Sequence, residues 1–264
     1  MKLVAENITF SYHNIPSLKD VSLELEEAQI LGIIGPNGSG KTTLLKCINR
    51  ILKPKQGKIA IDSKELKKMS RLEIAKHIGY VPQSSVAPYA LTVFEVVLMG
   101  RRPHIGWQSS EKDIEKTWQI LAMLNIECLA MRHFNELSGG EQQRVLISRS
   151  LAQEAKVLLL DEPTSNLDIK NQLEVMDLTR GLVEKEKIAA IVAIHDLNLA
   201  ARYCDKIVMM KEGRIFASGN TGSVLTPECI RTVYGVEVVI TRTNNIQQIV
   251  PIRPSTKTPI ELPQ

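Results

Sequence analysis

The sequence predicts an α/β protein with a parallel-sheet core, an antiparallel β subdomain and an inserted helical subdomain. From residue 157 onward, short apolar runs alternate with helical segments, which is the pattern of parallel strands buried between helices. Residues 2–10 and 21–27 alternate apolar and polar side chains, as antiparallel strands do. Residues 84–137 have helical spacing and no strand-like run, which indicates a helical insertion.

The first half of the chain contains the first parallel strand, at residues 29–34, where a continuous apolar run turns sharply into glycines. A helix is expected over 42–52, and Pro54 ends it. The elements that follow are short: a strand at 58–61, a helix at 71–77, a strand at Ile78–Val81, and two helices of the insertion at 92–99 and 111–124.

The second half returns to buried strands and helices in alternation, which are expected in turn at 157–160, 169–184, 189–194, Leu197–Tyr203 and 206–210. A short helix is expected to begin at Thr226 and Pro227, with Gly235 after its end. Residues 236–240 and 247–252 predict a hairpin around Asn244 and Asn245. We therefore expect one domain over 2–240 and a short C-terminal hairpin and tail over 241–264, of which the last dozen residues are frayed.

Length and composition are those of a soluble globular protein. The 264 residues suffice for a core without disulfides or metals, and the net charge of +4 is spread along the chain, so no nucleic-acid partner is expected. The four cysteines are widely spaced and form no CxxC pair, which argues against a zinc site and suits a reducing compartment. The longest clean apolar run, 188–194, is far shorter than the roughly 20 residues that cross a bilayer, so a partner must supply any membrane association.

A phosphate-binding loop is predicted at residues 35–42, which fit the pattern GxxxxGK[ST] between an expected strand and an expected helix. Backbone N–H groups of such a loop wrap the phosphates of ATP, while Lys41 neutralises the β and γ phosphates and Thr42 ligates Mg²⁺. The predicted nucleotide-binding residues are Gly35, Pro36, Asn37, Gly38, Ser39, Gly40, Lys41, Thr42 and Thr43.

Two adjacent carboxylates end the apolar run that begins at residue 157. A strand there delivers Asp161 to the carboxyl edge of the sheet, where ligands of α/β proteins bind. Asp161 can then face Mg²⁺, while Glu162 faces the γ-phosphate and polarises the attacking water. Two surface acids after a core strand are the common alternative, and the phosphate loop favours the catalytic interpretation.

A second anion-binding helix end is predicted at residues 137–144, which read LSGGEQQR. Taken alone, Ser138 and two glycines would indicate only a helix cap. Because the chain already has a phosphate loop, a second phosphate-facing device suggests that it faces the ATP of another subunit. These segments together predict an ATPase driven by ATP-dependent dimerisation.

These motifs resemble the nucleotide-binding domain of ATP-binding cassette (ABC) ATPases over about residues 2–240. The resemblance implies a P-loop NTPase fold, ATP and Mg²⁺ as cofactors, and Glu162 as catalytic base. It also implies that a signature segment completes the partner's ATP site through Ser138, Gly139, Gly140 and Glu141.

Five further positions match family residues: Gln83 at Mg²⁺ or water, His195 at the γ-phosphate, Ser165 and Asp168 across the dimer interface, and Tyr12 on adenine. The implied catalytic residues are Glu162, His195 and Gln83, and the implied Mg²⁺ ligands are Thr42, Gln83 and Asp161. Outside this context, His195 would be a local hydrogen bonder, Gln83 a loop amide and Tyr12 a strand aromatic.

The segment LTVFEVVLMGRRPHIGW, residues 91–107, resembles importer ATPases for iron-siderophore, haem and cobalamin uptake. That resemblance implies a peripheral subunit at the cytoplasmic face of the membrane, a second identical ATPase subunit, transmembrane permease subunits and a separate substrate-binding protein. Residues 84–101 are the expected dock for the permease. Another nutrient importer or an exporter stays open, and a soluble ABC ATPase is the least favoured alternative because no coiled-coil insertion or second cassette is present.

Overall fold

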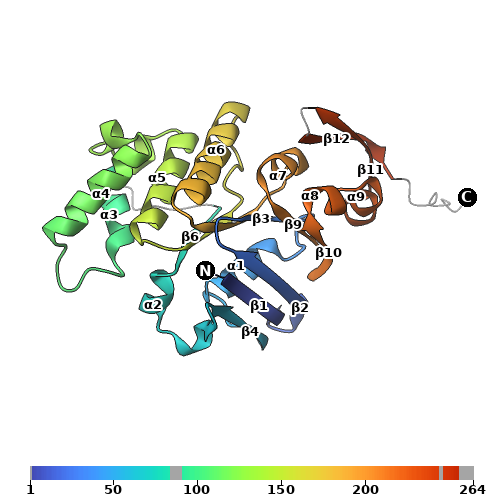
Figure 1. The fold of residues 1–264 in the computed structure, drawn as a ribbon, viewed down its shortest axis with the longest axis horizontal. Coiled ribbons are helices and arrows are strands. Elements are labelled where there is room, and N and C mark those ends of the chain that lie inside the picture. Colours follow the sequence, from blue (N-terminus) through green and yellow to red (C-terminus); the bar gives the residue numbers. More distant parts are fainter. Residues whose placement is uncertain (1, 84–90, 244–245, 256–264) are drawn as a thin grey trace, which may run out of the picture.

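The computed structural model describes residues 2–83, 91–243 and 246–255, whose strands form a six-stranded, a four-stranded and a two-stranded sheet. In Figure 1 the helices of the insertion lie at one end of the molecule and the C-terminal hairpin at the other, with the N-terminal strands below the central sheet. The α/β prediction with its antiparallel subdomain and helical insertion is confirmed. No helix in the described ranges combines the length and apolar character needed to cross a membrane.

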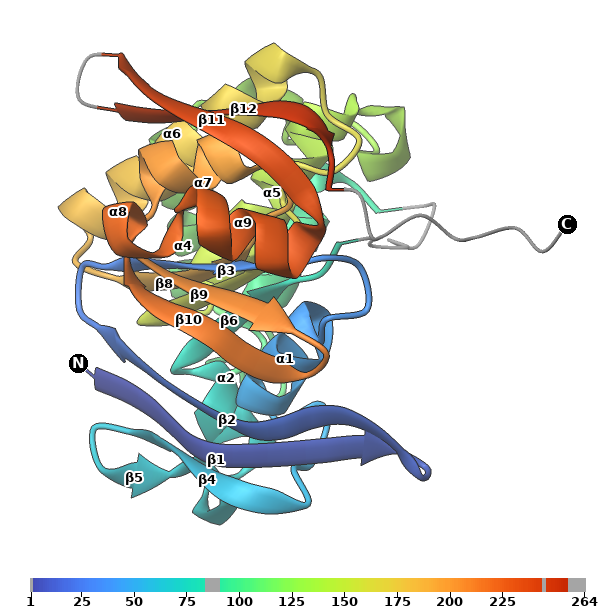
Figure 2. The ribbon, with the colours of Figure 1, turned by 90° about the vertical axis from the view of Figure 1, so that its right-hand side faces the viewer.

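The central sheet has the strand order β10-β9-β3-β8-β7-β6. Its parallel strands are β3 (Ile30–Ile34), β6 (Ile78–Val81), β7 (Val157–Asp161), β8 (Ala189–Ala193) and β9 (Lys206–Lys211). Every residue of β3, β7 and β8 is buried, because other elements cover both faces of the sheet (Figure 2). The carboxyl ends of these strands therefore meet at one edge.

The antiparallel edge strand β10 (Arg214–Asn220) was not among the predicted elements. Its side chains are half-buried or exposed in alternation, so it lacks the continuous apolar run of its neighbours. A turn at Glu212 and Gly213, both with positive φ, joins it to β9. Such a two-residue turn is typical of hairpins, and it is the signal from which β10 could have been predicted.

The N-terminal sheet has the order β2-β1-β4-β5, with β1 at Lys2–Tyr12, β2 at Ile15–Glu26, β4 at Gln56–Ile61 and β5 at Lys64–Glu65. The antiparallel pairing is confirmed, but β1 and β2 are longer than predicted. Only His13 and Asn14 separate them, since Pro16 pairs with Ser11 and Leu18 with Phe10. Leu3, Leu18 and Leu25 are fully buried in a core shared with α1 (Lys41–Ile48).

The helix after the phosphate loop is shorter than predicted. Helix α1 ends at Ile48 rather than at residue 52, because Asn49 leaves the helical conformation and Arg50 is left-handed with φ 55°. Arg50 donates hydrogen bonds to the carbonyls of Leu66 and Met69, which tie this turn to the next segment. That segment contains a 3₁₀ turn at Leu66–Lys68 and helix α2 at Arg71–Ala75.

The helical insertion contains α3 (Val93–Leu98) and α4 (Glu111–Met123). The ends of both helices lie within one residue of the predicted ends. Helix α5 (Gly139–Ala152) packs against both, and 3₁₀ turns lie at Met99–Arg101, Glu127–Leu129 and Phe134–Glu136. Arg101 and Asp113 form a buried ion pair at 3.1 Å. Hydrogen bonds from Ser110, and then the Arg101 guanidinium, lower the pKa of Asp113 to about 2.

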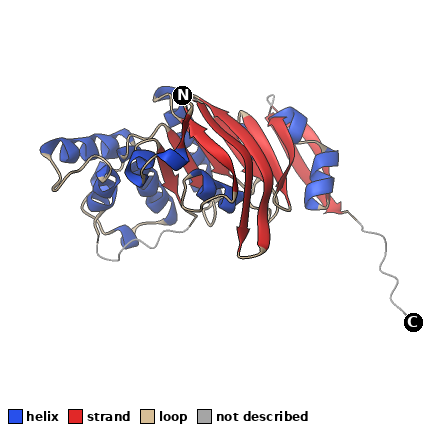
Figure 3. Ribbon diagram, turned by 90° about the horizontal axis from the view of Figure 1, so that it is seen from below, coloured by secondary structure: helices blue, strands red, loops and turns tan. Residues whose placement is uncertain are grey.

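The C-terminal part contains α6 (Ile169–Lys185), α7 (Leu197–Tyr203), α8 (Thr221–Val224), α9 (Pro227–Tyr234), β11 (Val236–Thr243) and β12 (Ile246–Pro254). The predicted start of α9 and the left-handed Gly235 after it, with φ 69°, are confirmed. The hairpin is present with longer strands, while Asn244 and Asn245 lie outside the described residues. Figure 3 shows it beside the central sheet, at the end opposite the helical insertion. The proposed domain boundary at 240/241 falls within β11 and stays a prediction.

Candidate functional site

Four chain segments place the predicted site residues at the carboxyl edge of the central sheet. The phosphate loop follows β3, Gln83 follows β6, Asp161 ends β7, and His195 follows β8. These strands are parallel neighbours, so their ends converge although the segments are far apart in the sequence.

The phosphate loop depends on glycine at two close approaches. Gly35 and Gly40 have φ of 150° and 106°, and a Cβ on Gly35 would lie 2.4 Å from the Met210 carbonyl oxygen. A Cβ on Gly40 would lie 2.9 Å from the carbonyl oxygen of Ser17. The loop therefore runs against β9 and β2, which fixes the path of the backbone N–H groups that lead into α1.

The Lys41 amine lies within the curve of the phosphate loop. Its Nζ donates to the carbonyl oxygens of Gly35 at 2.9 Å and Pro36 at 3.2 Å, and the residue is only 5% exposed. Burial lowers the pKa of Lys41, and the nearby carboxylates of Glu162 and Asp161 oppose that shift. The loop thus encloses an amine that, when protonated, would attract phosphate oxygens.

Thr42 and Asp161 form the candidate metal-binding pair. Thr42 Oγ1 donates to Asp161 Oδ1 at 2.8 Å, so a hydroxyl and a carboxylate oxygen are already adjacent. Within the described residues, no group of three or more His, Cys, Asp or Glu side chains could hold a metal. The Thr42 hydroxyl and the Asp161 carboxylate fit Mg²⁺, which takes few protein ligands and completes its shell with water and phosphate oxygens.

Glu162 is held by the two other residues predicted to be catalytic. Gln83 Nε2 donates to Glu162 Oε2 at 2.6 Å, and His195 Nε2 contacts Glu162 Oε1. Glu162 is 9% exposed, so both partners approach a carboxylate that solvent barely reaches. Gln83 contacts this carboxylate rather than the Thr42–Asp161 pair.

The backbone at Glu162 is left-handed, with φ 54°, which costs a side-chain-bearing residue about 1–2 kcal/mol. The Glu162 N–H donates to the Ala193 carbonyl at 3.1 Å, which anchors the turn to β8. Ser165 closes the turn, because both its N–H and its hydroxyl donate to the Glu162 carbonyl. Ser165 thus stabilises the turn that carries the Glu162 carboxylate.

The predicted trans-acting residues lie at two adjacent helix starts. Ser138 and Glu141 form a capping box on α5, and the hydrogen bonds from Ser138 lower the pKa of Glu141. Asp168 caps α6 by accepting from the Asn171 N–H at 2.8 Å. A Cβ on Gly140 would lie 2.3 Å from Asn171 Oδ1, so the two helix starts are in contact. In the described part of the chain, residues 138–141 make no hydrogen bond or ion pair to the phosphate loop.

Tyr12 ends β1, and its ring meets Phe10 edge to face at a centroid distance of 4.9 Å. It is 44% exposed, which leaves ring surface available for stacking.

Tyr80 is a site residue that the sequence did not reveal. Its hydroxyl donates to Asp161 Oδ2 at 3.0 Å, so both Asp161 carboxylate oxygens have a partner. Burial first, and then the charge of Asp161, raises the pKa of Tyr80 and keeps it protonated as a donor. The contact depends on the pairing of β6 with β7, and no motif marks it in the sequence.

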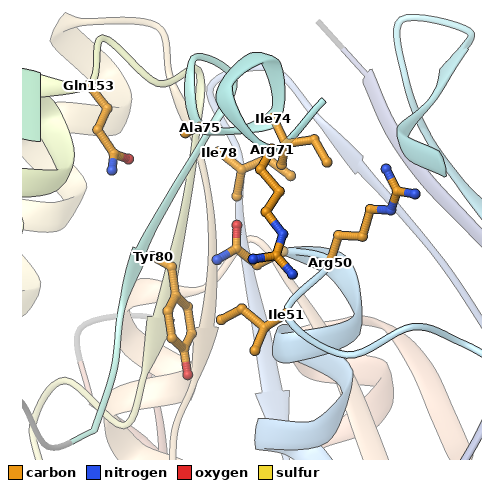
Figure 4. A pocket seen from close by; sticks show the side chains of 9 residues that line it. Arg50, Ile51, Arg71, Ile74, Ala75, Ile78, Tyr80 and Gln153 are labelled. Atoms are coloured by element: carbon orange, nitrogen blue, oxygen red, sulfur yellow. The ribbon is translucent and has the colours of Figure 1, made fainter. Parts of the chain in front are cut away.

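Tyr80 also lines a cavity of about 370 Å³ (Figure 4). Its lining comes from the end of α1, from α2 and β6, and from the end of α5. Tyr80 thus contacts Asp161 through its hydroxyl and is also one of the residues that line this cavity.

The chain matches the family model described as ABC transporter over residues 18–165. It is 50% identical to an uncharacterized ABC transporter ATP-binding protein of Methanocaldococcus jannaschii, over 96% of this chain and 98% of that protein. It is 39% identical to a petrobactin import ATP-binding protein of Bacillus anthracis, over 90% of this chain and 88% of that protein. A cobalamin import ATP-binding protein of Halobacterium salinarum is also 39% identical, over 84% of this chain and 56% of that longer protein.

Two solved structures share the fold and the sequence pattern. One is an inward-facing putative metal-chelate type ABC transporter, with a TM-score of 0.84 and 32% identity over 95% of this chain and 97% of that chain. The other is a dimeric ATP-binding cassette in a post-hydrolysis state with ADP and phosphate. It has a TM-score of 0.73 and 32% identity over 83% of this chain and 98% of that chain.

Proposed function

Because this chain belongs to the ABC transporter family and is an ATPase, we propose that it powers import of an iron-siderophore, haem or cobalamin across the cytoplasmic membrane. The proposal is supported by relatives named for petrobactin and cobalamin import and by the similar metal-chelate type transporter. The observation that carries the hydrolytic step is Glu162, which Gln83 and His195 hold beside the Thr42–Asp161 pair.

In the proposed mechanism, the backbone of the phosphate loop and Lys41 bind the phosphates of ATP. Bound at Thr42 and Asp161, Mg²⁺ would neutralise charge on the β and γ phosphates. Glu162 polarises the attacking water, and Gln83 and His195 keep its carboxylate in place. Each group at the carboxyl edge of the sheet thus has one role in the proposed mechanism.

We propose that two copies of the chain complete each other's sites. The starts of α5 and α6 carry residues 138–141 and Asp168. Among the residues that the structure describes, these make no hydrogen bond or ion pair with this chain's own phosphate loop. A head-to-tail pair related by twofold symmetry would place each α5 start against the partner's ATP. The similar dimeric cassette with ADP and phosphate supports this arrangement.

The further proposed partners are transmembrane permease subunits and a separate substrate-binding protein, with this chain peripheral at the cytoplasmic face. Residues 84–101 are the proposed dock for the permease. Of these, 84–90 lie outside the described residues, and 93–101 form α3 and the 3₁₀ turn Met99–Arg101.

The test is to purify the tagged chain from its native membranes in mild detergent and to identify the proteins that accompany it. A multi-spanning permease is expected, and the complex in liposomes should take up labelled ferric siderophore, hemin or cobalamin only with ATP. Lys41→Ala, in the same complex, is the control that should lower uptake at limiting ATP. Recovery without a permease, or with one whose liposomes move none of these cargoes inward, would refute the import function.

Replacing Tyr80 by phenylalanine should raise the Mg²⁺ concentration that gives half-maximal ATPase activity by roughly 10-fold. The variant removes one hydrogen bond to a charged carboxylate, which is worth about 1.5–3 kcal/mol, and keeps the ring that lines the cavity. The measurement is ATP hydrolysis against Mg²⁺ concentration at fixed ATP.

The matched control is Tyr203→Phe, which removes a hydroxyl that donates to Asp177 Oδ1 at 2.6 Å, away from the site. Its Mg²⁺ dependence should equal that of the unmodified chain. If both tyrosine variants shift the Mg²⁺ curve equally, the effect belongs to general packing and Tyr80 has no specific role at Asp161.

A further inference from the structure

His195 lies between the end of β8 and the start of helix α7, so the position of this helix start affects where its ring lies. The residue between His195 and the helix, Asp196, caps α7, because its Oδ1 accepts from the N–H groups of Asn198 at 2.7 Å and Leu199 at 3.1 Å. A displacement of the α7 start would therefore move the segment that carries the His195 side chain away from Glu162.

The two ends of α7 are held by different parts of the molecule. At its C-terminal end, the Tyr203 hydroxyl donates to Asp177 of α6, and Arg180 of α6 bonds the Tyr203 carbonyl. At its N-terminal end, a cleft of about 550 Å³ lies between α6, α7 and the C-terminal hairpin, and Asn198 is among its lining residues. The end next to His195 is thus the one that α6 does not hold closely.

The side chain of Asn198 ties this end to the hairpin. Its Oδ1 accepts from the Ile249 N–H at 2.8 Å, and its Nδ2 donates to the Ile249 carbonyl at 3.2 Å. The amide side chain satisfies both backbone groups of one β12 residue, as a neighbouring strand would. Ile249 is 4% exposed, so these two bonds lie at a packed contact rather than on a loose surface.

The hairpin that receives these bonds is itself anchored to the core. Helix α9, which leads into it, is tied to β9 by Lys211, whose Nζ donates to the Thr232 carbonyl at 2.8 Å. Burial raises the pKa of Tyr234, at the end of α9, which shows that α9 is packed against the rest of the molecule. Figure 2 shows the hairpin lying over α7 and α9. The C-terminal segment therefore contacts both β9 and the helix that follows His195.

We propose that Asn198 is a positioning residue, whose two hydrogen bonds to Ile249 let the C-terminal hairpin hold His195 against Glu162. The hairpin then serves the hydrolytic step although it contributes no group to the nucleotide. This inference rests on the proposed function, in which His195 keeps the Glu162 carboxylate in place.

The test compares Asn198→Leu, which removes both bonds, with the nearly isosteric Asn198→Asp, which keeps an acceptor for the Ile249 N–H and loses the donor. We expect Asn198→Leu to lower kcat roughly 10- to 100-fold, because small misplacements of catalytic groups have effects of that size. Asn198→Asp should lie between it and the unmodified chain. The Kd for ATP should not change, since Asn198 is not part of the phosphate loop, and Tyr203→Phe, at the other end of α7, should leave kcat unchanged.

Each substitution is then repeated in a His195→Ala background. If Asn198 acts through His195, Asn198→Leu should cause no further loss of kcat there. An equal fall in both backgrounds, or a fall that follows thermal stability across the variants, would show a merely structural role. Full kcat in both Asn198 variants, with a defect in His195→Ala, would refute the inference alone. Full kcat in His195→Ala would refute the proposed role of His195 and the inference with it.

Discussion

Replacing Glu162 by glutamine should lower the ATP turnover of this chain by roughly 10²- to 10⁴-fold, the range for loss of a general base. Glutamine has nearly the same size and keeps an oxygen and a nitrogen at the positions that Gln83 and His195 now contact. It cannot take a proton from the attacking water. ATP should therefore still bind through the phosphate loop and remain uncleaved.

Because ATP binding without hydrolysis should keep two copies together, the Glu162→Gln variant should elute as a dimer with ATP and as a monomer with ADP. The measurements are phosphate release and size-exclusion chromatography with light scattering. The control is Glu184→Gln, an exposed glutamate of α6 paired with Arg180 at 3.9 Å, which should behave as the unmodified chain. A monomeric Glu162→Gln variant with full activity would contradict the proposed mechanism.

Much of the fold could be predicted because its central strands are fully buried. The continuous apolar residues of β3, β7 and β8 indicate that burial directly, and the glycines of the phosphate loop indicate the turn after β3. The missed strand β10 is an edge strand with alternating exposure, so its residues carry a weaker signal. The early end of α1 depends on Arg50, whose guanidinium binds carbonyls of a later segment, and local propensity does not record such a contact.

The residues of the candidate site also differ in whether the sequence predicts them. Residues in local motifs, such as Lys41 and Glu162, could be named from spacing alone, and the structure brings them to one edge of the sheet. Tyr80 and Asn198 could not, because their partners are 81 and 51 residues away and the contacts depend on strand pairing and on the seating of the hairpin. No sequence motif predicts the left-handed backbone conformation of Glu162, which accompanies hydrogen bonds to Ala193 and Ser165.

Replacing Lys41 by alanine should weaken ATP binding by roughly 10- to 100-fold, which corresponds to the loss of a charge-assisted hydrogen bond of about 1.5–3 kcal/mol. The lysine is the cation that the loop encloses, and Asp161 and Glu162 lie close enough to affect its pKa. Without Lys41, the repulsion between these carboxylates and the phosphates of ATP would no longer be offset by its positive charge. The measurement is calorimetric titration with ATP, and Lys46→Ala, in the last turn of the same helix, is the charge-matched control.

Lys41→Ala also removes the hydrogen bonds to the carbonyls of Gly35 and Pro36, so loop distortion and charge loss must be separated. Lys41→Arg keeps the charge and supplies donors for these carbonyls, while Lys41→Met keeps the buried stem and loses both charge and donors. If charge dominates, Lys41→Met should bind ATP as weakly as Lys41→Ala, and Lys41→Arg should recover part of the affinity. If Lys41→Met instead binds ATP as the unmodified chain does, burial of the stem shapes the loop and the phosphates are held by backbone N–H groups alone.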